Sequence, residues 1–177
     1  MINPLLADWS TPFQIAPFNA ISDDDFAPAL DEALAAHDAE IAAIAQNVSP
    51  ASFENVIGAL ESAGGALDKV LSVFFTVAGA DSNSAREELQ RDFSPKLAAH
   101  FSRITANKAL FQRLQDVWTN RDGLNLSDEQ TRVLMLTHRG FVRAGAALTG
   151  VEDTRMAEIK SRLAALSTSF TQNLLSD

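Results

Sequence analysis

The stretch that decides the fold is FAPALDEALAAHDAEIAAIAQN, residues 26–47. Its apolar side chains recur every three or four residues, which places them on one face of an α-helix. That face consists of Phe26, Leu30, Leu34, His37, Ile41 and Ile44. Ser22 and the aspartates at 23–25 supply capping oxygens and negative charge, which favour a helix N-terminus. Because Pro28 is tolerated only in a first turn, the helix is predicted to begin near Asp25 and to end near Asn47.

Before this helix, residues 1–21 are predicted to form an extended N-terminal arm. Its three prolines fix φ and remove backbone donors, so regular structure is disfavoured. They are Pro4, Pro12 and Pro17. Trp9, Phe13 and Phe18 are large apolar groups, and we expect them to pin the arm onto a larger body.

After the first helix, a second is predicted to begin at Ser52. Its apolar stripe keeps its phase across the glycines at 64–65, so we expect one long helix that kinks there. A third helix follows the turn at 81–83. An interior Pro95 costs about 3 kcal/mol, so this helix either kinks or restarts with Ser94 as its cap.

The C-terminal half predicts three further helices. A short one holds Leu110–Trp118, and a capping box formed by Ser127 and Gln130 opens the next, which runs to about Leu148. After Gly150 comes the last helix, whose stripe has no closing Gly, Asn or Pro. That stripe includes Leu163, Leu166, Phe170 and Leu174. The fold class is therefore all-α: an antiparallel bundle of about six helices, with an arm at 1–21 and a helical domain at 22–177.

Composition excludes several classes of protein. The chain has 177 residues and no cysteine, so it holds no disulfide and no cysteine-ligated metal. Its formal net charge of −9 argues against a nucleic-acid partner, which would require a concentrated basic surface. The first residues lack a basic and apolar secretory pattern, and no uninterrupted apolar run is long enough to cross a membrane. We therefore expect a cytoplasmic protein with no membrane partner.

Motifs that carry chemistry are absent. The histidines, His37, His100 and His138, have no second His four residues away and no Glu three residues before them. We therefore assign no catalytic, cofactor-binding or metal residue. His37 and His100 are expected to pack between helices, whereas His138 and Arg139 are expected to be solvated. Arg139 and Arg143 could grip an anion, but a solvated helix face is the preferred interpretation.

Several segments together resemble a known family. NPLLADWSTPFQIAPFNAI, the 26–47 helix, SFENVIGALESAGGALDKVLSVFFTVAGADSN, LFQRLQDVW and FVRAGAAL occur in this order along almost the whole chain. In this order they are similar to the N-terminal portion of the thimet-oligopeptidase-like zinc metallopeptidases, closest to the peptidyl-dipeptidase branch. The resemblance implies a cytoplasmic zinc peptidase that releases C-terminal dipeptides from short peptides.

In that family a His-Glu-x-x-His helix and a downstream Glu hold the zinc, and neither has a counterpart here. The resemblance therefore implies a non-catalytic portion that forms part of a channel wall, with zinc and the catalytic domain supplied by a longer parent chain. It also implies apolar surface on the arm and on the last helix, which the catalytic domain would cover. A free-standing helical binding module is the alternative, and a bundle that self-associates through the last helix is a third.

Overall fold

The computed structural model describes the chain from residue 2 to residue 176 and, in the last helix, the side chains of residues 150–156, 158–160, 162, 163, 166 and 170. The regular structure of this part is entirely helical, which confirms the all-α prediction. Its α-helices are α1 (Phe26–Gln46), α2 (Ala59–Ser62), α3 (Gly65–Ala80), α4 (Ser84–Ala106), α5 (Lys108–Asn120), α6 (Asp128–Arg143) and α7 (Gly150–Ser176).

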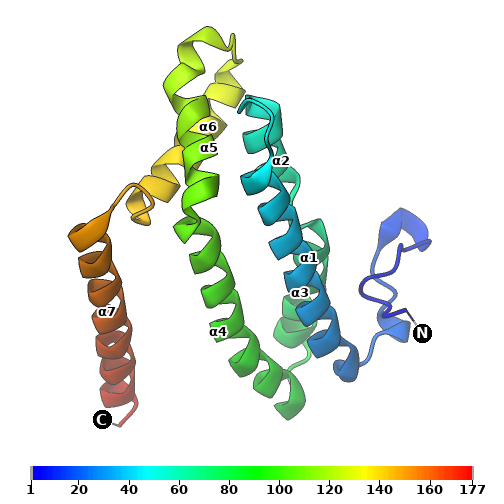
Figure 1. The fold of residues 1–177 in the computed structure, drawn as a ribbon. Coiled ribbons are helices and arrows are strands. Elements are labelled where there is room, and N and C mark those ends of the chain that lie inside the picture. The colour runs from blue at the N-terminus through cyan, green and yellow to red at the C-terminus, as the bar shows by residue number, and fades with distance from the viewer. Residues whose placement is uncertain (1, 177) are drawn as a thin grey trace.

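The helices form an antiparallel bundle (Figure 1). Helix α1 packs most extensively on α3, which runs in the opposite direction, and α4 returns alongside them. Helix α5 continues in roughly the direction of α4, and α6 folds back onto α5. Helix α7 stands beyond α4, on the side away from α1. This arrangement confirms the predicted bundle.

The N-terminal arm is folded into short 3₁₀ turns, and a different side chain anchors it than predicted. Leu5 is completely buried, whereas Phe13 is 95% exposed and Phe18 is 49% exposed. The expectation that both phenylalanines pin the arm is therefore wrong. Trp9 does hold the arm, because its Nε1 donates to the Pro4 carbonyl at 2.9 Å and Lys69 Nζ lies 4.2 Å from its ring centroid. Phe13 itself lies in the left-handed region, with a φ of 58°.

Helix α1 begins and ends where the sequence predicts. The Asp25 carboxylate accepts hydrogen bonds from Ser22 N and Oγ, each at 2.7 Å, and these bonds close the turn that leads into Phe26. The neighbouring Asp23 accepts from Arg86 Nε at 2.7 Å, and this bond lowers the pKa of Asp23. That ion pair joins the start of α1 to the start of α4.

Two hydrophobic cores share α1. The arm-side core lies around its first half and consists of Leu5, Phe26, Ala29, Leu30, Ala33, Leu67, Val70, Val73, Phe74 and Phe93. The distal core lies around its last turns and consists of Ile41, Ile44, Val56, Ile57, Leu110, Leu114, Val117, Leu134, Phe141 and Ala146. The spacing of three and four residues along α1 thus supplies both cores from one face.

The second predicted helix is broken, which corrects the expectation of one kinked helix. Phe53–Gly58 forms a π-helical turn that continues into α2. Ala63 is extended and Gly64 is left-handed, with a φ of 82°, so α3 starts afresh at Gly65. Gly64 N donates to Glu40 Oε2 at 2.6 Å, so a carboxylate on α1 holds this break.

The segment Phe53–Ala80 is long and apolar enough to cross a membrane by length and composition alone. The break at Gly64 interrupts it as a helix. Leu67, Val70 and Phe74 direct its most apolar face into the arm-side core. Of its most apolar 18-residue window, 28% is buried.

The structure decides between the two alternatives for α4 at Pro95 and corrects the predicted end of α6. Helix α4 passes through Pro95 without restarting, and the exposed Ser94 hydroxyl donates to the Gln90 carbonyl at 2.7 Å. Helix α6 ends at Arg143 instead of about Leu148. Gly145 takes a φ of 94° there, and its N–H bonds the Val142 carbonyl at 3.0 Å, which closes the helix end.

We predict opposite effects for alanine at the two adjacent glycines. Gly64→Ala should lower the free energy of unfolding by about 1–2 kcal/mol or more, because a left-handed alanine is strained and its Cβ would lie 3.1 Å from the His37 ring. Gly65→Ala, the matched control, meets no atom within 4 Å and should stabilise by about 0.5–1 kcal/mol. Urea denaturation measures both, and equal effects would contradict the break at Gly64.

Candidate functional site

His37 and His100 meet between α1 and α4. Nε2 of His100 lies 3.0 Å from Nδ1 of His37, although 63 residues separate them in the chain. Their exposed fractions are 9% for His37 and 0% for His100. Both therefore pack between helices, as predicted, but their direct contact was not foreseen.

An ion pair lies beside this histidine pair. Asp38 Oδ1 lies 3.2 Å from His100 Nδ1, and Asp38 Oδ2 accepts from an Arg103 guanidinium nitrogen at 3.0 Å. The same guanidinium nitrogen lies 3.4 Å from His100 Nδ1, so this ring nitrogen faces both a donor and an acceptor. Of the two nitrogens that face each other between the rings, one donates the hydrogen and the other accepts it.

The histidine pair lies at the level where the two cores meet. On α1, His37 separates Ala33 of the arm-side core from Ile41 of the distal core. The Gly64 break packs against the His37 ring at the same level. We call this layer the polar belt; its residues are His37, Asp38, Glu40, His100 and Arg103.

His138 is packed, not solvated, which corrects the prediction. Its ring stacks on Trp118 with centroids 4.5 Å apart and an interplanar angle of 8°. Nε2 of His138 lies 2.8 Å from Gln115 Oε1. The stack arises because α6 folds back onto α5, a contact that the polar neighbours of His138 in the sequence do not reveal. Arg139 and Arg143 are exposed, as expected for a solvated face.

Burial shifts the pKa of two of these histidines. It lowers the pKa of His100, an effect that the Asp38 carboxylate opposes. Burial also lowers the pKa of His138, and the nearby Arg121 charge adds to this shift. Both rings therefore favour the neutral state when the chain is folded.

We predict that the free energy of unfolding decreases as the pH falls below about 6.5. The unfolded chain takes up protons at the ordinary histidine pKa, whereas His100 and His138 take them up only at lower pH when folded. The stabilisation is therefore complete above about 6.5 and is lost below it. Urea denaturation at a series of pH values measures the slope, and His138→Gln removes one of the two contributions. A free energy of unfolding that rises as the pH falls below about 6.5 would contradict the lowered pKa values of His100 and His138.

The geometry brings two predicted histidines together but does not build a metal site from them. Among the described side chains, no three His, Asp or Glu residues converge as metal ligands. His138 belongs to the α5–α6 stack instead of the polar belt. The assignment of no catalytic, cofactor-binding or metal residue remains a prediction.

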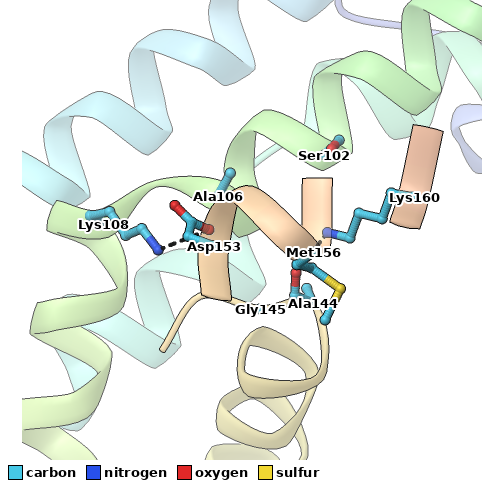
Figure 2. A pocket seen from close by; sticks show the side chains of 8 residues that line it. All are labelled: Ser102, Ala106, Lys108, Ala144, Gly145, Asp153, Met156 and Lys160. Atoms are coloured by element: carbon cyan, nitrogen blue, oxygen red, sulfur yellow. Dashed lines mark hydrogen bonds and ion pairs between the residues drawn. The ribbon is translucent and has the colours of Figure 1, made fainter. Parts of the chain in front are cut away.

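A cavity of about 200 Å³ lies where α4 and α5 meet the start of α7 (Figure 2). Lys108 Nζ donates to the carbonyls of Ala146 and Leu148 at 3.1 and 2.7 Å and lies 3.6 Å from Asp153 Oδ1. Lys160 Nζ donates to the Ala144 carbonyl at 2.7 Å. Both ammonium groups therefore satisfy the carbonyls that follow α6, so this cavity is a capped junction and not an anion site.

We predict that Lys108→Met loosens this junction. Two charge-assisted hydrogen bonds to carbonyls would be lost, which should cost about 1 kcal/mol at a half-exposed site. Asp153→Asn is the matched control, because it removes only the ion pair and should cost less than about 0.5 kcal/mol. Hydrogen exchange of the amides at 144–148 reports the effect, and equal protection in both variants would contradict the capping role.

Exposed large apolar side chains gather on α7 and on the arm, among other places on the described surface. On α7, residues at helical spacing form the α7 stripe: Ile159, Leu163, Leu166 and Phe170, exposed by 41%, 60%, 54% and 69%. Leu174, which the sequence adds to this stripe, lies outside the described side chains. On the arm, the exposed group is Phe13, Ile15 and Phe18. These are the two places where the sequence predicted apolar surface.

The fold and these surfaces define the class: an all-helical chain that exposes apolar side chains on α7 and on its N-terminal arm. Comparison with known proteins then gives the family. The chain is 38% identical to the dipeptidyl carboxypeptidase of Salmonella typhimurium over 173 residues, 98% of this chain and 25% of that protein. The dipeptidyl carboxypeptidase of Escherichia coli is 36% identical over 174 residues, 98% of this chain and 26% of that protein.

Oligopeptidase A of Salmonella typhimurium is a more distant relative, 25% identical over 175 residues, 99% of this chain and 25% of that protein. No family model matches the chain. The chain is thus homologous to the N-terminal portion of the thimet-oligopeptidase-like peptidases, on the peptidyl-dipeptidase side of the family. It spans about a quarter of the length of the curated relatives it matches.

Proposed function

We propose that this chain is the helical channel-wall portion of a zinc-dependent dipeptidyl carboxypeptidase that acts on short peptides in the cytoplasm. The observation that carries the proposal is the match of 98% of this chain, at 38% identity, to a quarter of a dipeptidyl carboxypeptidase. Identity at this level, spread over nearly the whole chain, supports a shared structural role. The 177-residue chain itself is proposed to be non-catalytic.

The described residues do not fit a zinc site. His37 and His100 point their facing nitrogens at each other, and Asp38 is engaged with His100 and Arg103. A zinc ion normally takes four ligands, three of them from protein in a catalytic site. We therefore assign zinc, and the chemistry it supplies, to the part of the relatives that has no counterpart here, and we derive no reaction step from this chain.

The exposed apolar surfaces support a partner for this portion. Burying a Leu or Phe side chain stabilises a protein or complex by about 1.5–3 kcal/mol, so covering the α7 stripe is energetically favourable. We propose that the catalytic domain of the same parent chain covers the α7 stripe and the apolar group of the arm. A free-standing binding module would use the same stripe for another protein, and a self-associating bundle would pair it between copies.

A reconstitution experiment tests this proposal. The purified 177-residue chain is assayed with a short peptide and zinc, and no dipeptide release is expected. It is then mixed with the remaining three quarters of the Salmonella typhimurium relative, produced without the matched quarter. We expect a complex that releases C-terminal dipeptides. Zinc-dependent release by the chain alone would contradict the non-catalytic role.

Variants of the α7 stripe locate the contact. Leu163→Asp with Leu166→Asp should weaken the complex by about tenfold or more, because two buried apolar groups are lost. Thr154→Asp is the matched control, since helical spacing places it on the opposite side of α7 and it should change little. A folded chain that forms no complex with the remaining portion would favour the free-standing module.

A further inference from the structure

We propose that the His37–His100 pair is a pH-dependent latch that releases the part of α4 around His100 from α1 when both rings are protonated. The inference does not depend on the proposed peptidase role. It rests on the direct contact of two buried rings from different helices, at the level where the two hydrophobic cores meet.

The first step concerns how α4 is held. Leu89, Phe93 and Leu97 of α4 pack in or on the arm-side core, and Ile104 packs on the distal core. Between Leu97 and Ile104, the buried contact with α1 is the His37–His100 hydrogen bond. The nearby ion pairs, Lys96–Asp31 and Arg103–Asp38, involve half-exposed side chains and contribute little.

The second step concerns the protons. In the neutral pair, one of the two facing nitrogens, Nδ1 of His37 and Nε2 of His100, carries a hydrogen and donates it to the other. When both rings are protonated, both facing nitrogens carry a hydrogen, and neither can accept. The hydrogen bond is lost, and two positive rings face each other across a distance of about 3 Å in a buried site.

The third step concerns the surrounding charges. From α1, the groups that face the pair are Asp38 and Glu40; from α4, the group is Arg103. Glu40 is engaged with the backbone N–H of Gly64, and Asp38 shares its carboxylate with Arg103. The single shared carboxylate offsets one positive ring but not two. The doubly protonated pair therefore favours separation of the helices over contact.

The absence of cysteine in the sequence permits a direct distance measurement. Cysteines replace the exposed Ala39 of α1 and Ala99 of α4, each carries a spin label, and His138→Gln is added to remove the third titrating ring. Distances are recorded by pulsed electron paramagnetic resonance at about pH 8 and about pH 5, on either side of the histidine range. We expect a longer and broader α1–α4 distance distribution at the lower pH.

The matched variant keeps the hydrogen bond but cannot be protonated. His37→Asn places an amide near the position of Nδ1, and His100→Gln places one near the position of Nε2. In this double variant the distance should be the same at both pH values. An equal lengthening in the double variant, or no lengthening in the parent, would overturn the proposal.

A second measurement applies if the double variant fails to fold. The ring protons of the unsubstituted chain are titrated by nuclear magnetic resonance. The latch predicts that contacts between α1 and α4 are kept while at least one of the two rings is neutral and are lost when both are protonated. Contacts that persist when both rings are protonated would overturn it.

Discussion

The constraint on which the rest of the structure depends is that one face of α1 serves two hydrophobic cores. A 21-residue helix is long enough to carry two separate groups of buried side chains on one stripe. Phe26 and Leu30 belong to the arm-side core, and Ile41 and Ile44 belong to the distal core. Between them the stripe holds a single polar position, His37, so whatever packs there has to satisfy a buried ring nitrogen. His100, supplied by α4, meets that requirement.

Features that depend on neighbouring residues were predictable from the sequence. The capping oxygens of Ser22 and Asp25 set the start of α1, and Ser127 with Gln130 caps α6 as a capping box. The sequence also contains a signal for the histidine contact. His100 continues the apolar spacing of Phe93 and Leu97 on α4, just as His37 continues the stripe of α1. Two histidines at buried positions need partners, and each is the simplest partner for the other.

Features that depend on distant residues were not predictable in this way. The glycine pair at 64–65 keeps the stripe in phase, so local sequence indicates a continuous helix. The break arises because Glu40 accepts the Gly64 N–H and because the His37 ring fills the space beside the glycine. Both partners lie more than twenty residues earlier in the chain. Similarly, the stacking of His138 on Trp118 requires α6 to fold back onto α5, which no local pattern specifies.

The apolar face of α7 is exposed, whereas the corresponding face of α1 is buried in two cores. Its stripe of Ile159, Leu163, Leu166 and Phe170 has the same spacing as the stripe of α1, but these side chains are 41–69% exposed. Helices in proteins gain most of their stability from packing an apolar face, not from intrinsic propensity. In the described structure, α7 is held at its first turns, where Lys108 and Lys160 bind the carbonyls that follow α6. The capped junction therefore holds the start of α7, and covering the α7 stripe would stabilise the helix beyond its first turns. Under the proposed function, that cover comes from the three quarters of the relatives' length that this chain does not span.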